Sequence, residues 1–455
     1  MNKSSSIYIT THLDCIAPLL ALIKASAASQ GLLCSFSECR RGANYTPAGS
    51  NGNIDTFHCG APMHDITING FCDPKFAAIE SAFSQNFLDH GEVGAAVSVY
   101  QHNQKVVDLW AGHLDAQQQR PLSQQTLFTV WSLGKAVAAL CVLRLVDAGK
   151  LQLDDTVAKH WPEFAQNGKA AITVAELLSH RAGLVAVDTP LPAGAWAIWP
   201  LYVRALEQQK PWWLSGERHG YHVHTYGFLL GELLQRVDGR SIAQYLQDEI
   251  CQPLDIDFFY GVPDNALGRI ADNIPYIGPA QAATAAIDPS NLAALSDDQR
   301  MVDLTCNNPA FSDEGEFSLN SKRWRQAMFP STSGQSDARS TAKIFSALAN
   351  GGEIDGVQLL SPELIEQAIA ISADGTDAVM SRPTRFGLGF MLTLPQRPLG
   401  PNPRTFGHYG NAGLLGFADP DANLSFCYTM NKQGRAWRDP RNIALVDALY
   451  DSVKQ

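Results

Sequence analysis

The sequence predicts an α+β protein, in which helices flank an antiparallel sheet whose two halves are separated by a mainly helical insertion. Strand-like apolar runs occur at residues 94–100 and 106–112, and again near the C-terminus at residues 405–410 and 424–430. The chain between them has helical spacing or an irregular composition. Because the strands gather at the two ends instead of alternating with helices, an α+β arrangement is favoured over βαβ units.

The elements of the first half follow from apolar spacing and turn residues. Residues 76–83 repeat apolar side chains at helical spacing. The runs 94–100 and 106–112 are joined by a short polar turn, which is typical of a hairpin. Residues 131–149 are apolar almost all round and end at a glycine, so they predict a buried helix with a glycine just past its end.

The second half contains further helices between irregular stretches. Residues 220–237 predict a helix that follows an irregular lead-in segment, and residues 338–349 predict another that ends at a pair of glycines. Residues 272–330 are rich in Pro, Ala, Asn and Asp, which indicates loops and brief helices. The last predicted helix, residues 442–453, is amphipathic.

Composition and charge exclude several classes of protein. The chain has 455 residues, of which 45% are hydrophobic and 17% charged, so it is neither disordered nor fibrous. Its net charge of −11 argues against nucleic acid or an anionic membrane as a partner, because phosphate binding needs basic patches. No run approaches the roughly 18 apolar residues of a membrane span.

The cysteines bear on the cellular compartment. There are nine, an odd number, at irregular spacings and without a Cys-x-x-Cys pair. This pattern disfavours a zinc site or a redox dithiol and favours the reducing cytoplasm. Export is the alternative, since residues 15–29 weakly resemble the apolar core of a signal peptide, although Asp14 and Lys24 break that pattern.

Two Ser-x-x-Lys pairs are the first candidates for chemistry. On a helix, such a spacing places both side chains on one face, where a lysine in a dry site could help to activate the serine hydroxyl. Ser132 and Lys135 lie in the apolar segment, where an ammonium without a partner is costly. Ser340 and Lys343 have charged neighbours and are expected to be a solvated serine and a surface lysine. The Gly-x-Ser-x-Gly signature of an α/β-hydrolase does not occur.

Four blocks in this order resemble the serine β-lactamase and penicillin-binding-protein superfamily, and within it most nearly the family VIII carboxylesterases. They are Ser-Leu-Gly-Lys at 132–135, Leu-Leu-Ser-His-Arg-Ala-Gly-Leu at 177–184, Gly-Tyr-His-Val-His-Thr-Tyr-Gly at 220–227 and Gly-His-Tyr-Gly at 407–410. The resemblance implies the β-lactamase/DD-peptidase fold, an α/β/α sandwich with a mainly helical subdomain.

The resemblance begins near Met63 and implies a division of the chain. Residues 1–62 are expected to be a flexible extension, so that a chain starting at Met63 would fold and stay active. Residues 63–455 would form the hydrolase domain. Within it, residues 63–135 and 331–455 would form the sheet subdomain, and residues 136–330 the helical one.

The resemblance also implies the catalytic roles. Ser132 matches the nucleophile that forms the acyl-enzyme, and Lys135 its activating partner. Tyr221 takes the first place of the family's Tyr-x-Asn block, where a tyrosine takes the serine proton and later assists the leaving group. The backbone N–H groups of Ser132 and Asn411 would form the oxyanion hole.

Two departures from the family pattern bear on the substrate. Val223 stands where β-lactamases have Asn, and it cannot form a hydrogen bond through its side chain. His408, followed by Tyr409 and Gly410, replaces Lys-Thr-Gly, so an imidazole that is mostly neutral at pH 7 takes the place of a fixed cation. Both changes favour neutral esters over carboxylate-bearing β-lactams. Trp212 and Trp213 either line the acyl pocket or only cap the core.

The remaining histidines and tyrosines have simpler interpretations. His219, His222 and His224 cluster, but no carboxylate or cysteine accompanies them at ligand spacing, so no metal is expected. Tyr226 is expected in the core, and His180 as a buried, hydrogen-bonded histidine.

The predicted function is therefore a serine carboxylic-ester hydrolase that acts on small, short-chain, neutral esters without a cofactor. A β-lactamase or D-amino-acid-directed peptidase or amidase is the alternative within enzymes, and a non-catalytic protein that has kept the fold is the alternative outside them. Acyl-chain preference and oligomeric state cannot be read from the sequence.

Overall fold

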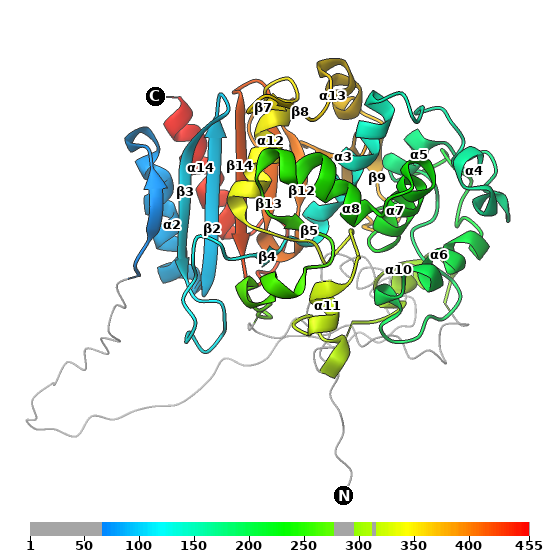
Figure 1. Ribbon diagram of the computed structural model, residues 1–455, viewed down its shortest axis with the longest axis horizontal. Coiled ribbons are helices and arrows are strands. Elements are labelled where there is room, and N and C mark those ends of the chain that lie inside the picture. The colour runs from blue at the N-terminus through cyan, green and yellow to red at the C-terminus, as the bar shows by residue number, and fades with distance from the viewer. Residues whose placement is uncertain (1–65, 277–294, 312–314, 455) are drawn as a thin grey trace, which may run out of the picture.

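A nine-stranded antiparallel sheet forms the centre of the molecule (Figure 1). The computed structural model describes residues 66–276, 295–311 and 315–454, so the extension predicted at residues 1–62 lies outside the described part. The strand order is β1-β3-β2-β14-β13-β12-β11-β10-β9. Strands from the two ends of the chain meet where β14 pairs with β2, which confirms a sheet whose halves are joined across an insertion.

The longest strands of this sheet are the neighbours β3, β2 and β14, with 9, 8 and 7 residues. Their bounds are β1 Asn69–Cys72, β2 Gly94–Gln101, β3 Gln104–Gly112, β9 Ala373–Thr376, β10 Pro383–Phe386, β11 Met391–Leu392, β12 Phe406–Tyr409, β13 Leu415–Asp419 and β14 Leu424–Met430. Two small sheets contain β4 Phe128–Thr129, β5 Phe258–Phe259 and β6 Gln335–Ser336, and β7 Glu353–Ile354 and β8 Val357–Gln358.

Helices cover both faces of the sheet, and the alternation of side chains along β14 shows which helix covers which face. Ser425 donates a hydrogen bond to the Ala342 carbonyl in α12 (Ala338–Ala349). Tyr428, of the opposite parity, donates to Glu92, which pairs with Arg441 in α14 (Pro440–Val453). All seven residues of β14 are buried, as expected for a strand covered on both sides. The predicted α+β sandwich is confirmed.

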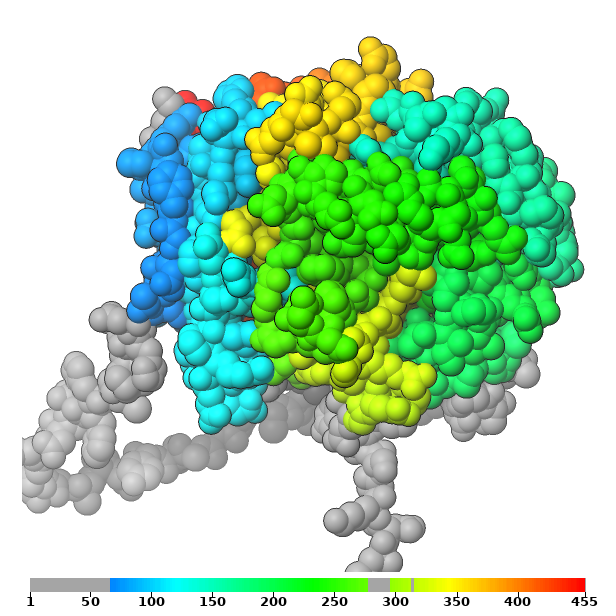
Figure 2. Space-filling model, viewed as in Figure 1, coloured from blue at the N-terminus to red at the C-terminus, as the bar shows by residue number. Residues whose placement is uncertain are grey.

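The remaining helices complete the sandwich and the insertion. Helix α2 (Ala77–His90) packs against α14, and α3 (Gly134–Asp147) against α7 (Thr225–Asp238). The others are α4 Val157–His160, α5 Val174–Leu178, α6 Trp199–Gln208, α8 Ile242–Leu246, α9 Gln252–Leu254, α10 Asp297–Asn307, α11 Lys322–Gln326 and α13 Pro362–Ile369. In Figure 2 the insertion, teal to green, fills the right side of the face in view, and its green part borders the cyan N-terminal segment. In the ranges described, no helix is long and apolar enough to cross a membrane.

The structure corrects one expectation from the sequence. The helix that carries Ser340 and Lys343, α12, is not a solvated surface helix: ten of its twelve residues are buried, Ser340 among them. The charged neighbours suggested a solvated face, but α12 lies on the central strands β2, β13 and β14, where small residues permit close packing. Strand β13 was also not anticipated.

Candidate active site

Ser132 and Lys135 meet where a 3₁₀ turn, η2 (Trp131–Leu133), leads into α3. The Lys135 ammonium nitrogen lies 3.0 Å from Ser132 Oγ, within hydrogen-bond distance. Ser132 is partly exposed, whereas the side chain of Lys135 is fully buried. The spacing of three residues therefore does place the two groups in contact, with the hydroxyl accessible and the amine shielded from solvent.

A second contact fixes the buried lysine. Lys135 Nζ donates to the Ser331 carbonyl oxygen at 2.8 Å, and Ser331 Oγ in turn accepts from the Gly227 amide at 2.6 Å. Ser331 thus links the lysine to the start of α7. Sequence reasoning missed Ser331, because a backbone carbonyl 196 residues away carries no signal in the sequence.

The backbone around the nucleophile is strained and crowded. Trp131, which directly precedes Ser132, has a φ of 51°, a left-handed conformation that costs a non-glycine residue of order 1–3 kcal/mol. Its side chain is buried against Trp324. At Gly134, a Cβ atom would lie 2.5 Å from the Pro330 carbonyl oxygen, so only glycine permits this close approach.

Tyr221 lies in the segment before α7 and is 2% exposed. Its ring stacks on Phe386 at 5.9 Å with an interplanar angle of 3°, and the Lys135 nitrogen lies 5.0 Å from the ring centroid. Trp213 packs behind this segment, since a Cβ at Gly220 would lie 2.7 Å from its indole ring. The structure thus brings Tyr221 beside the Ser132 and Lys135 pair and places Trp213 next to the tyrosine's own segment.

His408 occupies the inner side of β12 with its ring centroid 5.9 Å from that of Tyr221. Its Nδ1 donates to the Tyr409 carbonyl oxygen at 2.6 Å, because a carbonyl can only accept. Burial and, secondarily, the nearby Lys135 charge lower the pKa of His408 to about 3. Its Nε2 is therefore a lone-pair acceptor at neutral pH, and it is buried with no hydrogen-bond partner among the described residues.

Gly410 and Asn411 follow β12 and approach the nucleophile from the sheet. A Cβ at Gly410 would lie 2.9 Å from the Val130 carbonyl oxygen, two residues before Ser132. Asn411 opens a 3₁₀ turn, η9 (Asn411–Gly413), and its side-chain Nδ2 is buried and has no partner in the ranges that the structure describes. Only glycine permits this close approach of the β12 end to the segment that leads into Ser132.

The sequence profile of the family described as Beta-lactamase matches residues 76–450, which is more than half of the 455-residue chain. The chain belongs to the beta-lactamase family.

Relatives within and around the family match over most of their length. The Esterase/beta-lactamase LipL of Mycobacterium tuberculosis is 30% identical over 370 residues, covering 80% of this chain and 82% of LipL. A penicillin-binding protein homolog from Caulobacter crescentus superposes with a TM-score of 0.77 at 38% identity, covering 85% of this chain and 100% of that one. A family VIII carboxylesterase has the same TM-score and coverage at 33% identity. The resemblance inferred from the motifs is confirmed.

Two buried histidines, His180 and His222, form hydrogen bonds that hold the segment containing Tyr221. His180 Nδ1 accepts from the His222 amide at 3.1 Å. His222 Nδ1 donates to the Gly220 carbonyl at 2.8 Å, and its Nε2 accepts from the Leu184 amide at 3.2 Å. Burial lowers the pKa of both histidines, that of His222 to about 3, so both stay neutral. His180 is the buried, hydrogen-bonded histidine that the sequence predicts.

The other histidines and the second tyrosine of this segment lie in separate environments. His219 Nε2 contacts Thr384, and His224 packs between two phenylalanine rings, so the three neighbouring histidines do not converge. Across the described ranges, no group of three potential ligands could hold a metal ion. Tyr226 is fully buried and donates to the Leu178 carbonyl at 2.8 Å, which confirms its core position.

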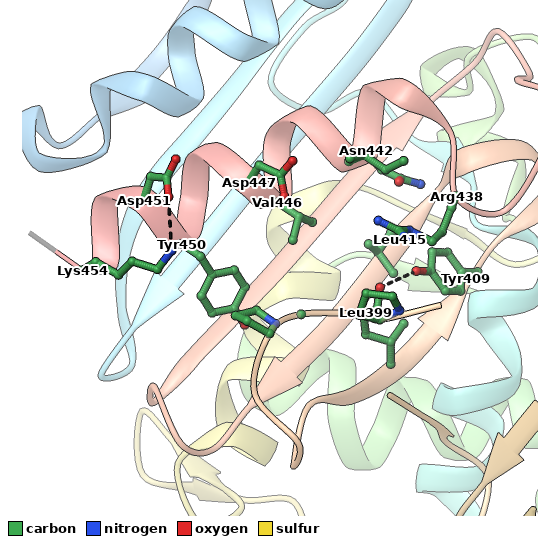
Figure 3. Close-up of a pocket in the computed structure, with 14 residues that line it drawn as sticks. Leu399, Tyr409, Leu415, Arg438, Asn442, Val446, Asp447, Tyr450, Asp451 and Lys454 are labelled. Carbon is green, nitrogen blue, oxygen red and sulfur yellow. Dashed lines mark hydrogen bonds and ion pairs between the residues drawn. The ribbon is translucent and has the colours of Figure 1, made fainter. Parts of the chain in front are cut away.

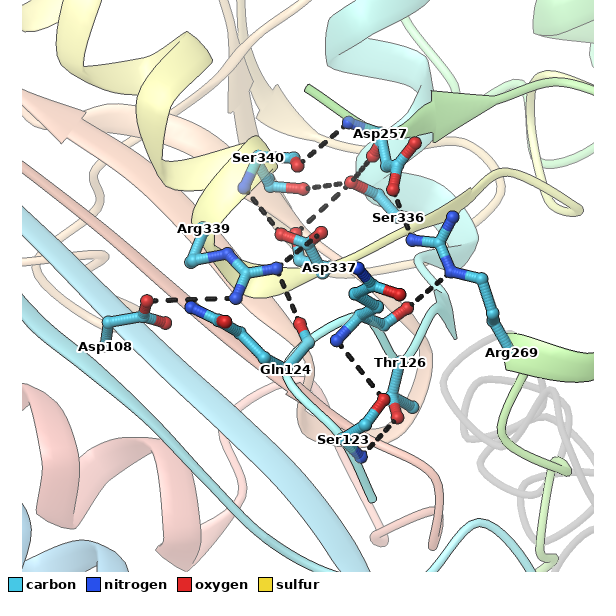
Figure 4. Close-up of polar contacts among 12 residues, drawn as sticks. Asp108, Ser123, Gln124, Thr126, Asp257, Arg269, Ser336, Asp337, Arg339 and Ser340 are labelled. Atoms are coloured by element: carbon cyan, nitrogen blue, oxygen red, sulfur yellow. Dashed lines mark hydrogen bonds and ion pairs between the residues drawn. The ribbon is translucent and has the colours of Figure 1, made fainter. Parts of the chain in front are cut away.

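Ser340, the serine of the second Ser-x-x-Lys pair, is part of a network of polar contacts around Asp337 (Figure 4). Ser340 Oγ accepts from the Asp257 amide at 3.0 Å, and its own amide donates to Asp337, which caps α12. Lys343 turns away from the serine: its Nζ donates to the Leu254 carbonyl at 2.8 Å and pairs with Asp355 at 2.6 Å. Here Ser340 and Lys343 connect α12 to the segment that contains Leu254 and Asp257.

A cavity of about 360 Å³ lies on the other face of β12 (Figure 3). It is lined by the loop at residues 398–401, by Tyr409 and by the inner side of α14. Tyr409 and His408 are successive strand residues, so their side chains point to opposite faces of the sheet. The cavity is therefore separated from Ser132 by the sheet.

Proposed function

We propose that this protein is a serine carboxylic-ester hydrolase that forms an acyl-enzyme on Ser132. The observation that carries the proposal is the contact of 3.0 Å between Ser132 Oγ and a lysine that is fully buried. A buried ammonium costs several kcal/mol unless it has partners or a task, and this one lies against the partly exposed hydroxyl. The names of LipL and of the family VIII carboxylesterase support the same activity.

The proposed reaction has two steps. In the first, Ser132 Oγ attacks the ester carbonyl carbon while its proton passes to the pair formed by Tyr221 and Lys135, and the N–H groups of Ser132 and Asn411 stabilise the oxyanion. The bond to the alcohol oxygen then breaks, and the alcohol leaves with that proton. In the second step, water attacks the acyl-Ser132 carbonyl and gives its proton to the same Tyr221 and Lys135 pair, the bond to Ser132 Oγ breaks, and the pair returns that proton to Oγ as the acid is released.

The environment of the site supports neutral, short-chain esters as substrates. His408 offers a neutral acceptor where the family pattern has a cation, so a substrate carboxylate would meet no fixed positive charge from that position. Val223 is 5% exposed and adds no polar group. Trp213 Nε1 and Asn411 Nδ2 are buried and have no hydrogen-bond partner within the described part of the chain.

A β-lactamase or D-amino-acid-directed peptidase or amidase is the second candidate, and the name of LipL includes beta-lactamase beside esterase. Rates on p-nitrophenyl acyl esters and on a chromogenic cephalosporin separate the two. We expect a clear preference for the ester, with weak or no hydrolysis of the cephalosporin. A preference for the cephalosporin would refute the esterase proposal, and a series of acyl chains from acetyl to decanoyl would define the substrate.

Other parts of the proposal concern the whole chain. We expect residues 63–455 to act as one hydrolase domain in the cytoplasm. Five cysteines in the described part are free thiols, and four of them are buried, which is compatible with a reducing compartment. Activity of a chain that starts at Met63, measured against the full chain, tests the domain proposal.

A further inference from the structure

The turn after β9 contains a buried carboxylate that neither the motifs nor the mechanism above uses. Asp377 is fully buried. Its Oδ1 accepts from the amides of Val379 and Met380, both at 2.9 Å, and so closes its own turn. The same Oδ1 accepts a third hydrogen bond, at 3.1 Å, from the backbone amide of Tyr221, 156 residues earlier in the chain.

The second oxygen of this carboxylate leads back to the same segment. Thr384, in β10, donates from its hydroxyl to Asp377 Oδ2 at 2.9 Å. Because that hydroxyl has a single proton, its oxygen accepts from His219 Nε2 at 2.9 Å, which places the imidazole proton on Nε2. The His219 carbonyl in turn accepts from the Ala378 amide at 3.0 Å. Both ends of the stretch 219–221 are thus held by the β9–β10 connection.

Strand β10 also fixes the ring of the tyrosine. Thr384 and Phe386 are two residues apart and point to the same face of the strand. Phe386 stacks on the Tyr221 ring at 5.9 Å, nearly parallel. One short strand and one turn therefore determine both where the backbone of Tyr221 lies and how its ring is oriented.

The chemical nature of Asp377 suits this task. In the described part of the chain no ion pair joins this carboxylate to a lysine or arginine, and His219 Nε2 lies 4.0 Å from its Oδ2. Burial of a charged group without hydrogen bonds is costly, and here four donors replace the lost water. An aliphatic side chain would leave the Tyr221 amide without this acceptor.

We propose that Asp377, supported by Thr384, is a positioning residue that holds Tyr221 where it can transfer protons to and from Ser132 and the leaving group. This inference rests on the proposed function, since it assigns Asp377 to the same reaction. A displacement of about 1 Å in a catalytic group can cost about a hundredfold in rate. When Tyr221 is displaced, the loss of rate should be greatest for the step in which it protonates the departing alcohol.

The test compares two butyrate esters that form the same acyl-enzyme. p-Nitrophenolate leaves as a stable anion, whereas ethanol needs a proton, so kcat/KM for ethyl butyrate depends more strongly on a correctly placed Tyr221. For Asp377→Ala in the full chain, we expect kcat/KM to fall about a hundredfold on ethyl butyrate and at least tenfold less on p-nitrophenyl butyrate. Asp377→Asn, which keeps one acceptor oxygen, should recover most of the activity. Tyr221→Phe should show the same selectivity for the leaving group.

The controls separate positioning from stability. Asp374→Ala removes an exposed carboxylate of β9 that pairs with Arg385, and it should leave both rates unchanged. If Asp377→Ala does not fold, Thr384→Val tests the proposal instead, and Thr384→Ser is its matched control. The valine variant should lower kcat/KM on ethyl butyrate relative to p-nitrophenyl butyrate, as expected for Asp377→Ala. The serine variant, which keeps the hydroxyl, should leave this ratio unchanged. Equal losses on both esters in a folded variant, or an unchanged ratio in Thr384→Val, would overturn the proposal. Failure of the proposed function looks different, because wild type would then hydrolyse neither ester.

Discussion

The two Ser-x-x-Lys pairs have the same spacing and entirely different surroundings. In the first, Lys135 is fully buried and contacts Ser132 Oγ at 3.0 Å. In the second, Lys343 is directed away from Ser340, toward a carbonyl and the exposed carboxylate of Asp355.

The serines differ in the same way. Ser132 is partly exposed, so a substrate can reach its hydroxyl. Ser340 is buried, and its hydroxyl accepts a backbone amide. A Ser-x-x-Lys spacing places the hydroxyl and the amine on one helix face, but whether they contact each other depends on the surrounding tertiary structure. Substituting the serine and the lysine of each pair therefore tests whether the two pairs have different roles.

The largest effect is expected at the serines. Ser132→Ala removes the nucleophile, and kcat on p-nitrophenyl butyrate should fall by about 10⁴-fold or more, as for other serine hydrolases. Ser340→Ala should keep wild-type kcat, because its hydroxyl only accepts a structural hydrogen bond. Steady-state kinetics on the two purified variants check this. Activity retained in Ser132→Ala would contradict the assignment.

The lysines should differ by a smaller factor. Lys135→Met keeps the volume but removes the group that helps to take the serine proton, so kcat should drop by about 10²- to 10⁴-fold. Lys343→Met breaks a partly exposed ion pair and should cost at most about 1 kcal/mol in the free energy of unfolding, with unchanged kcat. Urea denaturation and kinetics on both variants give the two values. A large loss of activity in Lys343→Met would make the comparison untenable.

The neutral imidazole beside the first pair should appear in the pH dependence of stability. Burial depresses the pKa of His408 from 6.5 to about 3, so the unfolded chain binds a proton in this range that the folded protein does not. The contribution of neutral His408 to stability is therefore complete above pH 6.5 and is lost progressively as the pH falls toward 3.

A variant that cannot titrate isolates this contribution. In His408→Gln, the slope of the free energy of unfolding between pH 6 and 4 should decrease by about 1.4 kcal/mol per pH unit, which corresponds to one proton. Urea denaturation at several pH values measures the slope. An unchanged slope of the free energy of unfolding against pH would mean that His408 is protonated in the folded protein. Its Nε2 could then not accept a hydrogen bond.

The smallest effect concerns the structural role of the second serine. Ser340→Ala leaves the Asp257 amide without its acceptor and should lower the free energy of unfolding by about 1–2 kcal/mol. Ser340→Thr keeps the hydroxyl and serves as the matched control. Thermal denaturation compares both with wild type, and a fully stable Ser340→Ala would show that the hydrogen bond contributes nothing.

Much of the fold followed from local patterns in the sequence. The hairpin of β2 and β3 and the helices α3, α12 and α14 lie close to their expected positions, because their apolar spacing is regular and their ends carry turn residues or glycines. The burial of α12 did not follow, since its charged neighbours belong to ends and turns while its small residues face the sheet.

The site was predictable only where side chains follow each other in one segment. Ser132 and Lys135 lie three residues apart, and their contact follows from helix geometry. The contacts of Ser331 with Lys135 and of Asp377 with Tyr221 depend on backbone groups 196 and 156 residues away, and only tertiary structure brings them together. The predicted roles of Asn411, His408, Gly410 and Trp213 remain proposals, although the first three follow or belong to the strand beside the nucleophile.

The most direct test of the central claim locates the covalent intermediate. The full chain would be treated with a fluorophosphonate, which forms a stable adduct with an activated serine, then digested and mapped by mass spectrometry. We predict one adduct, on the peptide that contains Ser132, absent in Ser132→Ala and unchanged in Ser340→Ala. An adduct on Ser340, or no adduct in wild type, would contradict the account.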